Sequence, residues 1–364
     1  MTDLVSIARK LSKQPYLGEP KSAEPLAPDV SPRRYARIHY VKGEFPTALL
    51  LQLVEGFGPL GGGPREVSQS DAFVEVQKLF QLNGIRVPQI FADARDEGYL
   101  LLEDFGERPL WNALESWKED GFDPILRIDA SDYIREKMHQ AIALLVSFRA
   151  LSPDLANLPC IVFEKQPSID QLLKGPKEFT EYFLAKRSPS KRELTIFDEF
   201  TEQLSEEVLS HPKYVSHYDF ISHNVHVLAD SQLGVIDFQD ACLESPARDI
   251  HAILCDRGMD LLLGESLHRE LMNQAFQDYS GGGDIRQMYS EYAVHWDMRV
   301  AGRFTKLANE GRERYAQWIP GTAARVLRGL ERIHRKFERA GDLIEIIRKY
   351  EPEVSEQATD LWEF

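Results

Sequence analysis

The segment from His217 to Asp249 constrains the fold most strongly, because it predicts a tight β-hairpin with polar side chains at both outer ends. Two short β-branched or apolar runs, 225–228 and 233–236, flank a polar segment with the composition of a turn. Asn224 precedes the first run and Asp237 follows the second. Because the outer ends of an antiparallel hairpin are neighbours, the side-chain oxygens of Asn224 and Asp237 can bind one hard cation such as Mg²⁺.

A third polar residue, Asp219, lies upstream of Asn224 in the triplet His217-Tyr218-Asp219. Phosphoryl transfer needs little covalent chemistry from a protein. It needs positioning, charge neutralisation and a carboxylate that orients the attacking hydroxyl. Such a triplet alone is common by chance, but the triplet, the asparagine and the strand-ending aspartate in this order are not. We therefore expect Asp219 to be the catalytic base, with Asn224 and Asp237 as magnesium ligands and His217 as a packing residue.

This pattern resembles the aminoglycoside phosphotransferase family, a branch of the protein-kinase-like fold. The resemblance rests on residues 217–224 and on Ile236-Asp237-Phe238-Gln239-Asp240. The bacterial kinases that phosphorylate the anomeric hydroxyl of N-acetylmuramate and N-acetylglucosamine are similar in five further segments, which are 239–241, 247–250, 31–37, 98–106 and 302–308. The resemblance implies ATP and Mg²⁺ as cofactors and a sugar 1-phosphate product, used in recycling cell-wall sugars.

The order of the expected elements agrees with an α+β, bilobal protein-kinase-like fold. A small β-rich lobe, 1–105, would bind the nucleotide, with Glu103 and Phe105 at the hinge against the adenine. It would contain a helix at 2–13, a linker or extended segment at 19–32, strands at 35–41 and 48–54, a helix at 71–83, and strands at 85–92 and 98–103. A larger, mainly helical lobe, 106–364, would carry the catalytic and substrate residues. Its helices are expected at 132–150, 177–185 and 193–210 and throughout the part after residue 249.

Two segments are candidates for binding the ATP phosphates. The triplet 61–63 is all glycine but lacks a following Lys-Ser or Lys-Thr, which favours a surface loop. Residues 30–34, just before the strand at 35–41, offer backbone N–H groups together with Ser31, Arg33 and Arg34. We therefore expect this segment to bind the phosphates.

The lysine that usually pairs with the α- and β-phosphates is absent from the strand at 48–54, which contains Gln52 and no lysine. The amino-sugar kinases that this chain resembles also tend to lack it. Glu75, which lies where the ion-pair glutamate of kinases would be, then has no lysine partner. It would face solvent or pair with Arg34 or Arg37.

The sequence is compatible with more than one acceptor substrate. Asp240 is close enough to Asp237 to approach a second magnesium or a sugar hydroxyl, and Arg299 could pair with the carboxylate of N-acetylmuramate. A kinase for another small alcohol, such as an aminoglycoside, homoserine or choline, is an alternative. Choline would need an aromatic cage, for which the candidates are Tyr289, Tyr292 and Trp296. A nucleotide-binding pseudokinase scaffold is a further alternative, which the missing lysine permits.

The composition of the chain restricts the classes of protein and of partner that remain possible. The chain has 364 residues, of which 43% are hydrophobic, so it can bury a large core. A net charge of −15 argues against a nucleic-acid partner. No apolar run is long enough to span a membrane, no signal pattern opens the chain, and the three cysteines form no paired motif. We therefore expect a cytoplasmic monomer that acts on a small sugar and binds neither membranes nor nucleic acid.

Overall fold

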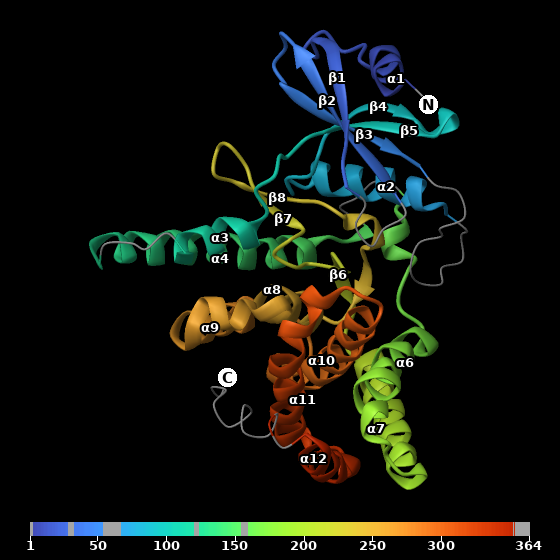
Figure 1. Cartoon of the computed structure of the whole chain (residues 1–364), viewed down its shortest axis with the longest axis vertical. Helices are drawn as coiled ribbons and strands as arrows, with labels where there is room; N and C mark the ends of the chain where they lie inside the picture. Colours follow the sequence, from blue (N-terminus) through green and yellow to red (C-terminus); the bar gives the residue numbers. More distant parts are fainter. Residues whose placement is uncertain are drawn as a thin grey trace.

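The computed structural model describes residues 3–27, 33–53, 67–119, 124–153, 159–351 and 353. The predicted α+β, bilobal architecture is confirmed, with a five-stranded antiparallel sheet at one end and mainly helices in the rest (Figure 1). The strands of this sheet lie in the order β1-β2-β3-β5-β4. Their bounds are β1 Glu19–Pro25, β2 Arg34–Val41, β3 Thr47–Gln52, β4 Ile90–Ala94 and β5 Tyr99–Glu103.

The central strand β3 is apolar because both of its faces are covered. Neighbouring residues of a strand point to opposite faces of the sheet. Leu50 accordingly packs in the core formed with α1 (Leu4–Leu11), whereas Leu51 packs in the larger core that contains α2 (Gln69–Leu82). The prediction of a central apolar strand here is confirmed.

Of two further predictions for this lobe, one holds for its first part and one needs correction. The segment at 19–32 was predicted to be a linker or an extended segment, and the extended alternative holds for Glu19–Pro25, which pairs with β2 as the edge strand β1. Proline is tolerated at an edge, where a missing N–H breaks no ladder hydrogen bond. The strand expected at 85–92 begins only at Ile90, and Ile85 and Val87 instead pack in the core around α2 without strand pairing.

Helix α2 joins the sheet to the helical part of the molecule. Its Phe73 contacts Phe238 with ring centroids 4.8 Å apart, and its Phe80 contacts Phe148 of α4 at 5.3 Å. Phe148 in turn meets Phe220 of the predicted catalytic loop, edge to face at 5.3 Å. The sheet, α2 and the catalytic loop therefore share one hydrophobic core.

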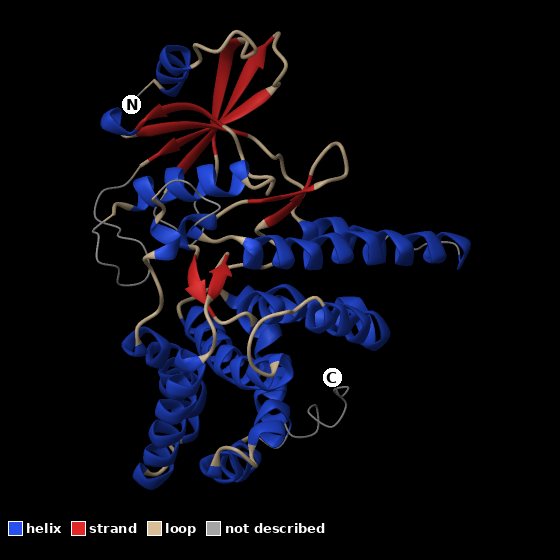
Figure 2. Ribbon diagram, turned by 180° about the vertical axis from the view of Figure 1, so that it is seen from behind, coloured by secondary structure: helices blue, strands red, loops and turns tan. Residues whose placement is uncertain are grey.

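The helical part has two groups of helices. Helices α3 and α4 project together from one side, while α6, α7 and α10–α12 form the end opposite the sheet (Figures 1 and 2). The segment predicted as a helix at 177–185 is helical, but it is the end of α6 followed by a π-helix at Phe179–Leu184 and not a separate α-helix. The helix bounds are α3 Leu110–Glu119, α4 Pro124–Ala150, α6 Ile169–Glu178, α7 Lys191–Ser210, α8 Ala247–Cys255, α9 Met259–Gln277, α10 Ile285–Asn309, α11 Ile319–Ile333 and α12 Glu338–Tyr350. Within the described residues, none of these helices combines the length and the apolar composition needed to cross a lipid bilayer.

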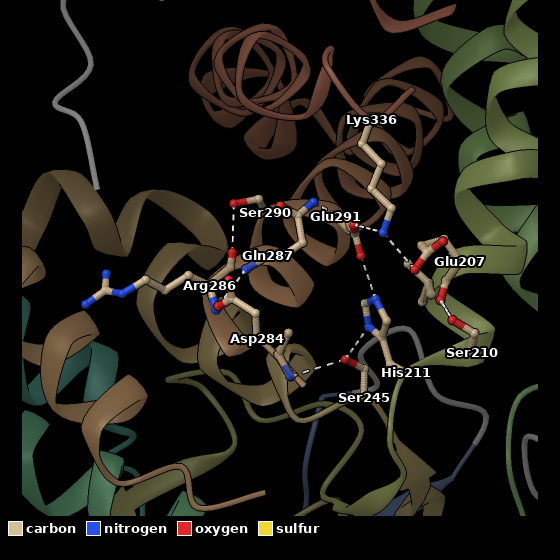
Figure 3. A network of polar contacts seen from close by, with 12 residues as sticks. Glu207, Ser210, His211, Ser245, Asp284, Arg286, Gln287, Ser290, Glu291 and Lys336 are labelled. Carbon is tan, nitrogen blue, oxygen red and sulfur yellow. Dashed lines mark hydrogen bonds and ion pairs between the residues drawn. The ribbon is translucent and has the colours of Figure 1, made fainter. Parts of the chain in front are cut away.

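A polar network ties α7 to α10 and to the segment after α11 (Figure 3). Lys336 Nζ lies 2.8 Å from Glu207 Oε1 and 2.6 Å from Glu291 Oε1. His211 bridges Glu291 Oε2 at 2.8 Å and Ser245 Oγ at 2.9 Å through its two ring nitrogens. Glu207, His211 and Glu291 approach closely enough to ligate a metal ion, but the Lys336 ammonium already supplies the positive charge there. We interpret this network as a structural tie.

A buried ionic network connects α8, α9, α10 and α11. Arg325 Nη1 lies 3.0 Å from Asp260 Oδ2, and its Nη2 lies 3.2 Å from Asp297 Oδ1. Asp297 Oδ2 is also 3.2 Å from His251 Nε2. Burial alone would raise the pKa of Asp297, but Arg325 and His251 lower it below the usual range. The network therefore holds Asp297 as a carboxylate inside the protein.

We expect the stabilisation that His251 provides to depend on pH. Burial alone would lower the pKa of His251, but the negative charges available at Cys255 and Asp297 raise it to about 10. A histidine whose folded pKa exceeds its unfolded value of about 6.5 stabilises fully below that pH, and its contribution is lost as the pH rises through the folded pKa. Urea unfolding of the wild type and of His251→Gln between pH 6 and 10 should give a free-energy difference that shrinks with rising pH. A constant difference would show that His251 is neutral in the folded protein.

Candidate active site

The hairpin predicted from the sequence is present and brings its two polar ends together. β7 (Val225–Val227) pairs antiparallel with β8 (Leu233–Val235), and the N–H of Ile236 donates to the carbonyl of Asn224 at 2.9 Å. Asn224 Nδ2 donates to the backbone carbonyl of Asp219 at 2.8 Å and to Asp219 Oδ2 at 3.3 Å. Because the amide nitrogen is used in this way, the Asn224 carbonyl Oδ1 is the atom that can face a cation.

The catalytic loop is held from below by Asp249 at the start of α8. Asp249 accepts hydrogen bonds from Ser216 Oγ at 2.9 Å and from the N–H of His217 at 2.8 Å. The His217 ring is buried, and its Nε2 donates to the carbonyl of Ile236 at 3.0 Å. Burial lowers the pKa of His217. A neutral, fully enclosed imidazole supports the loop and is not a base, in agreement with the prediction.

Arg248 fixes the conformation of Tyr218, which precedes the predicted base. Its Nε donates to the carbonyl of Tyr218 at 2.6 Å, and its guanidinium lies 3.5 Å from the centroid of the Tyr218 ring. Arg248 Nη1 also donates to the hydroxyl of Tyr292 at 2.6 Å. Tyr218 has a φ of 76°, which is costly for a residue with a side chain. The buried arginine therefore helps to impose the strained loop that presents Asp219.

Asp237 also adopts a left-handed conformation, with φ at 61° and ψ at 33°. Its Oδ1 accepts hydrogen bonds from Gln239 Nε2 at 3.0 Å and from Arg33 Nη1 at 3.2 Å. The side chain of Asp237 is 43% exposed, whereas that of Arg33 is only 9% exposed. The Asp237 carboxylate is accessible and already pairs with the Arg33 guanidinium, so it can also bind a magnesium ion. The Asp237 carboxylate and the Asn224 side-chain carbonyl together offer the oxygen donors that this ion prefers.

These residues line a cavity of about 1290 Å³ between the sheet and the helical part. Its wall includes β2, the hinge after β5, the catalytic loop, α6 and α10. Ligand sites are typically about 300–1,000 Å³, so this volume is sufficient for a nucleotide together with a small acceptor. Asp219, Asn224 and Asp237 all lie in its lining.

The hinge also lines the cavity. Glu103 pairs with Arg86, whose Nη1 donates to Glu103 Oε2 at 2.8 Å, and Arg86 lies over the Phe105 ring at 4.8 Å. Gly234 of β8 packs so closely on Phe105 that a Cβ at this position would come 2.5 Å from the ring. The absence of a side chain at Gly234 therefore lets the hinge rest on the hairpin. Glu103 and Phe105 stand where the sequence predicted, at the cavity edge.

The other residues that were predicted to bind the nucleotide differ in whether they line the cavity. Ser31 lies outside the described residues. Arg33 lines the cavity, whereas the neighbouring Arg34 is exposed and does not line it, since successive residues entering β2 point to opposite sides. Arg37 also lines the cavity and binds Asp104 at 2.6 Å.

Three further residues that the sequence singled out have different surroundings in the structure. Glu75 accepts a hydrogen bond from the N–H of Ile161 at 2.8 Å. Arg299 lines the cavity. Asp240 does not line the cavity. It lies beside Gln239, with Lys165 Nζ at 4.0 Å.

The sequence reasoning missed Arg248, Asp256 and Arg257, which all line the cavity. Arg248 lies inside the segment that carries the resemblance, in the first turn of α8, beside Asp249. Asp256 and Arg257 directly follow α8, where charged residues usually indicate solvent exposure. Nothing in the local sequence indicates that this helix end is buried.

Comparisons with known proteins agree with this geometry. A family model described as the phosphotransferase enzyme family matches residues 22–289. The N-acetylmuramate/N-acetylglucosamine kinase of Pseudomonas aeruginosa is 23% identical over 286 residues, which cover 71% of this chain and 75% of the relative. A protein of the same name from Pseudomonas putida is 25% identical over 188 residues, or 50% of this chain and 48% of the relative.

Two solved structures share the fold. A choline/ethanolamine kinase family protein from Mesorhizobium loti matches with a TM-score of 0.52 at 11% identity, covering 94% of this chain and 99% of that chain. A spectinomycin phosphotransferase in complex with ADP and spectinomycin matches with a TM-score of 0.51 at 12% identity, covering 86% and 93%. At such identities the likeness concerns the fold alone.

The fold and the family match define a kinase that acts on small molecules, a phosphotransferase with a hydroxyl group as acceptor. The chain belongs to the phosphotransferase enzyme family, whose model covers most of its length.

Proposed function

We propose that this kinase transfers the γ-phosphate of ATP to the anomeric hydroxyl of N-acetylmuramate or N-acetylglucosamine, in the recycling of cell-wall sugars. The phosphotransferase activity in this proposal is supported by one observation, which is that the same cavity is lined by Asp219, Asn224 and Asp237. The choice of acceptor is supported by the printed names of the two Pseudomonas relatives and by the charges that line the cavity.

In this mechanism Asp219 orients the acceptor hydroxyl and takes its proton as the oxygen attacks the γ-phosphorus. Asn224 fixes the Asp219 carboxylate and, with Asp237, would hold magnesium. Bound magnesium would neutralise phosphate charge during the transfer. Glu103 and Phe105 would bind the adenine at the hinge, and Arg33 would bind the phosphates.

The acceptor side of the cavity favours an anionic sugar over a polycation. Arg299, the predicted candidate for the carboxylate of N-acetylmuramate, lines the cavity together with Arg303, which is already paired with Glu178 at 2.7 Å. Further cationic residues from the helical part line the cavity, namely Lys174, Lys177, Arg248, Arg257, Lys306 and Arg314, against the carboxylates of Glu178, Glu181, Asp219 and Asp256. An aminoglycoside would bring several positive charges toward this set, although the protein as a whole carries a net charge of −15. The local charge therefore argues for a carboxylate-bearing acceptor.

A choline site lacks support in this cavity. The Trp296 ring has the Arg248 guanidinium 4.8 Å and the Arg299 guanidinium 5.0 Å from its centroid. Tyr292 is fully buried with its hydroxyl bound to Arg248, and Tyr289 is buried beside His251. The three residues predicted as an aromatic cage are thus used by arginine or by the core.

A panel of acceptors tests the proposal. The purified protein is incubated with Mg-ATP and N-acetylmuramate, N-acetylglucosamine, kanamycin, choline or homoserine, and ADP release is followed. We expect release with the two amino sugars only. Release with another acceptor would retain the kinase and reject the sugar, whereas nucleotide binding without any release would favour a pseudokinase scaffold.

Arg33 is expected to replace the phosphate-binding lysine that β3 lacks. It is a nearly buried cation that reaches the cavity from the sheet and pairs with Asp237 at 3.2 Å. Loss of one hydrogen bond to a charged group costs about 1.5–3 kcal/mol, so Arg33→Met should weaken Mg-ATP binding by roughly 10- to 100-fold. Calorimetric titration with Mg-ATP measures this. Arg34→Met is the matched control, and equal weakening in both variants would contradict the role of Arg33.

A further inference from the structure

Four planar side chains in the cavity wall pack on one another in a continuous series. The Arg248 guanidinium lies 3.5 Å from the centroid of the Tyr218 ring and 4.8 Å from the centroid of the Trp296 ring. The Arg299 guanidinium follows, 5.0 Å from the centroid of the Trp296 ring. All four line the cavity, although they come from the catalytic loop, α8 and α10. Contacts between a guanidinium and an aromatic face are attractive, so the series forms one supported surface of the cavity.

Tyr218, at one end of this series, directly precedes the predicted base Asp219. Its N–H donates to Ser216 Oγ at 2.9 Å, and its carbonyl accepts from Arg248 Nε at 2.6 Å. Arg248 therefore holds both the backbone and the ring of Tyr218. The φ of 76° is unfavourable without such support, and strain of this kind is concentrated at functional sites. The position of the Tyr218 ring is thus coupled to the position of Asp219.

The Tyr218 hydroxyl is a polar group that the described part of the chain leaves without a hydrogen bond. Tyr218 is partly exposed and lines the cavity. Its hydroxyl oxygen is bonded to no described residue, and it is not one of the enclosed polar atoms of the protein interior. A tyrosine hydroxyl can both donate and accept a hydrogen bond. A ligand in the cavity can therefore bind this hydroxyl without breaking a hydrogen bond inside the protein.

Arg299, at the other end of the series, is a cation without an ion pair among the described residues. Its aliphatic part packs on α6 at Gly175, where an added Cβ would come 2.9 Å from Arg299 Cβ and 3.1 Å from its Cδ. Its guanidinium is held by the Trp296 ring. The nearby Arg303 differs, because it already pairs with Glu178 at 2.7 Å. An anion can therefore bind Arg299 without displacing a carboxylate of the protein.

We propose that Tyr218 is an acceptor-binding residue, whose hydroxyl forms a hydrogen bond with a polar group that N-acetylmuramate and N-acetylglucosamine share. This inference rests on the proposed function and deepens it. Arg299 binds the carboxylate that N-acetylmuramate alone carries, so the two ends of the series recognise different parts of the acceptor. Because Tyr218 is coupled to Asp219, its hydrogen bond also helps to orient the reacting hydroxyl toward the base.

The experiment compares Tyr218→Phe with the wild type. This substitution removes the hydroxyl and keeps the ring that packs on Arg248, so the loop should keep its conformation. Calorimetry gives the Kd of each sugar for the ADP-bound protein and the Kd of Mg-ATP for the free protein, and kinetics give KM. We expect the Kd and KM of both sugars to rise by the same factor, about 2- to 10-fold, as for one lost hydrogen bond between uncharged groups.

The matched control is Tyr350→Phe, which removes a hydroxyl that binds Glu193 Oε2 at 3.0 Å at the end of α12. Tyr350 does not line the cavity. Its substitution should leave sugar binding unchanged, and Tyr218→Phe should match it in Mg-ATP binding and in melting temperature.

A second substitution, Arg299→Met, tests the other end of the series. It should weaken the binding of N-acetylmuramate by about 10- to 100-fold, the change expected for a lost hydrogen bond to a charged group, and that of N-acetylglucosamine far less. Equal weakening of both sugars by Arg299→Met would contradict the assignment of the two ends.

The outcomes separate the inference from the proposed function. If the wild type phosphorylates the sugars and Tyr218→Phe binds both as tightly as the control, the inference is overturned and the proposed function stands. Equal weakening of sugar and Mg-ATP binding by Tyr218→Phe, together with a lower melting temperature, would show a structural role and also overturn the inference. If the wild type neither binds nor phosphorylates either sugar, the proposed function fails and the inference fails with it.

Discussion

Replacing Asp219 with asparagine is expected to lower kcat by about 100- to 10,000-fold, the range over which a positioned general base contributes to catalysis. Asparagine keeps the size of the side chain and can still hydrogen-bond to the acceptor, but it cannot take the hydroxyl proton. Asn224 holds Asp219 through both its backbone carbonyl and its carboxylate, at 2.8 Å and 3.3 Å, so the loop should keep its conformation in the variant. Steady-state ADP release and calorimetric titration with Mg-ATP measure turnover and nucleotide binding separately.

The matched control for this experiment is Asp230→Asn, which changes the turn of the same hairpin. Asp230 is exposed and accepts a hydrogen bond from the N–H of Gln232 at 3.0 Å. We expect this variant to turn over like the wild type. Asp219→Asn with full turnover would show that another residue takes the proton, while loss of Mg-ATP binding would show that the variant disturbs the site as a whole.

Replacing Arg325 with methionine is expected to cause the largest loss of stability, about 3–5 kcal/mol in the free energy of unfolding, because removing one partner leaves buried charges without compensation. Arg325 is 8% exposed, and its partners Asp260 and Asp297 are 2% and 1% exposed. Burial alone would lower the pKa of Arg325, but the two aspartates raise it well above its usual value. The guanidinium is therefore charged, and two carboxylates, one in α9 and one in α10, depend on it.

Urea unfolding at pH 7 measures the loss, with Arg269→Met as the control. Arg269 lies on the exposed face of α9 and pairs with Glu265 one turn away. Exposed pairs contribute about 0–1 kcal/mol, so this control should differ little from the wild type. The difference between Arg325→Met and the wild type should also shrink toward pH 4, since Asp297 loses the cation that lowers its pKa and can then be protonated. Equal effects of the two substitutions would mean that the buried carboxylates need no cation.

Those parts of the site that depend on local geometry could be predicted from the sequence. The alternation of apolar residues and one turn determine the hairpin, and its register alone makes Asn224 and Asp237 neighbours. The catalytic loop ends where that hairpin begins, so its position follows from the same pattern. The central strand β3 was predictable for a similar reason, because a strand covered on both faces carries an unbroken apolar run.

Parts that depend on distant packing could not be predicted. The buried position of Asp256 results from the packing of α8, α9 and α10, and a charged residue at a helix end otherwise indicates solvent. Arg33 and Arg34 differ by one position, and which of them faces the cavity depends on where β2 begins, since a shift by one residue reverses the faces. The edge strand β1 was obscured by its prolines, which exclude a central strand but not an edge strand.

The central claim is that Asp219 directs the γ-phosphate of ATP to the anomeric oxygen of an N-acetylated amino sugar. Phosphorus NMR of the product formed from N-acetylmuramate tests it most directly, because the scalar coupling of the phosphate to the anomeric proton identifies the oxygen that was phosphorylated. We predict one phosphomonoester signal coupled to the anomeric proton, which is absent when Asp219→Asn replaces the wild type. A phosphate on any other oxygen, or no transfer by a protein that still binds Mg-ATP, would contradict the account.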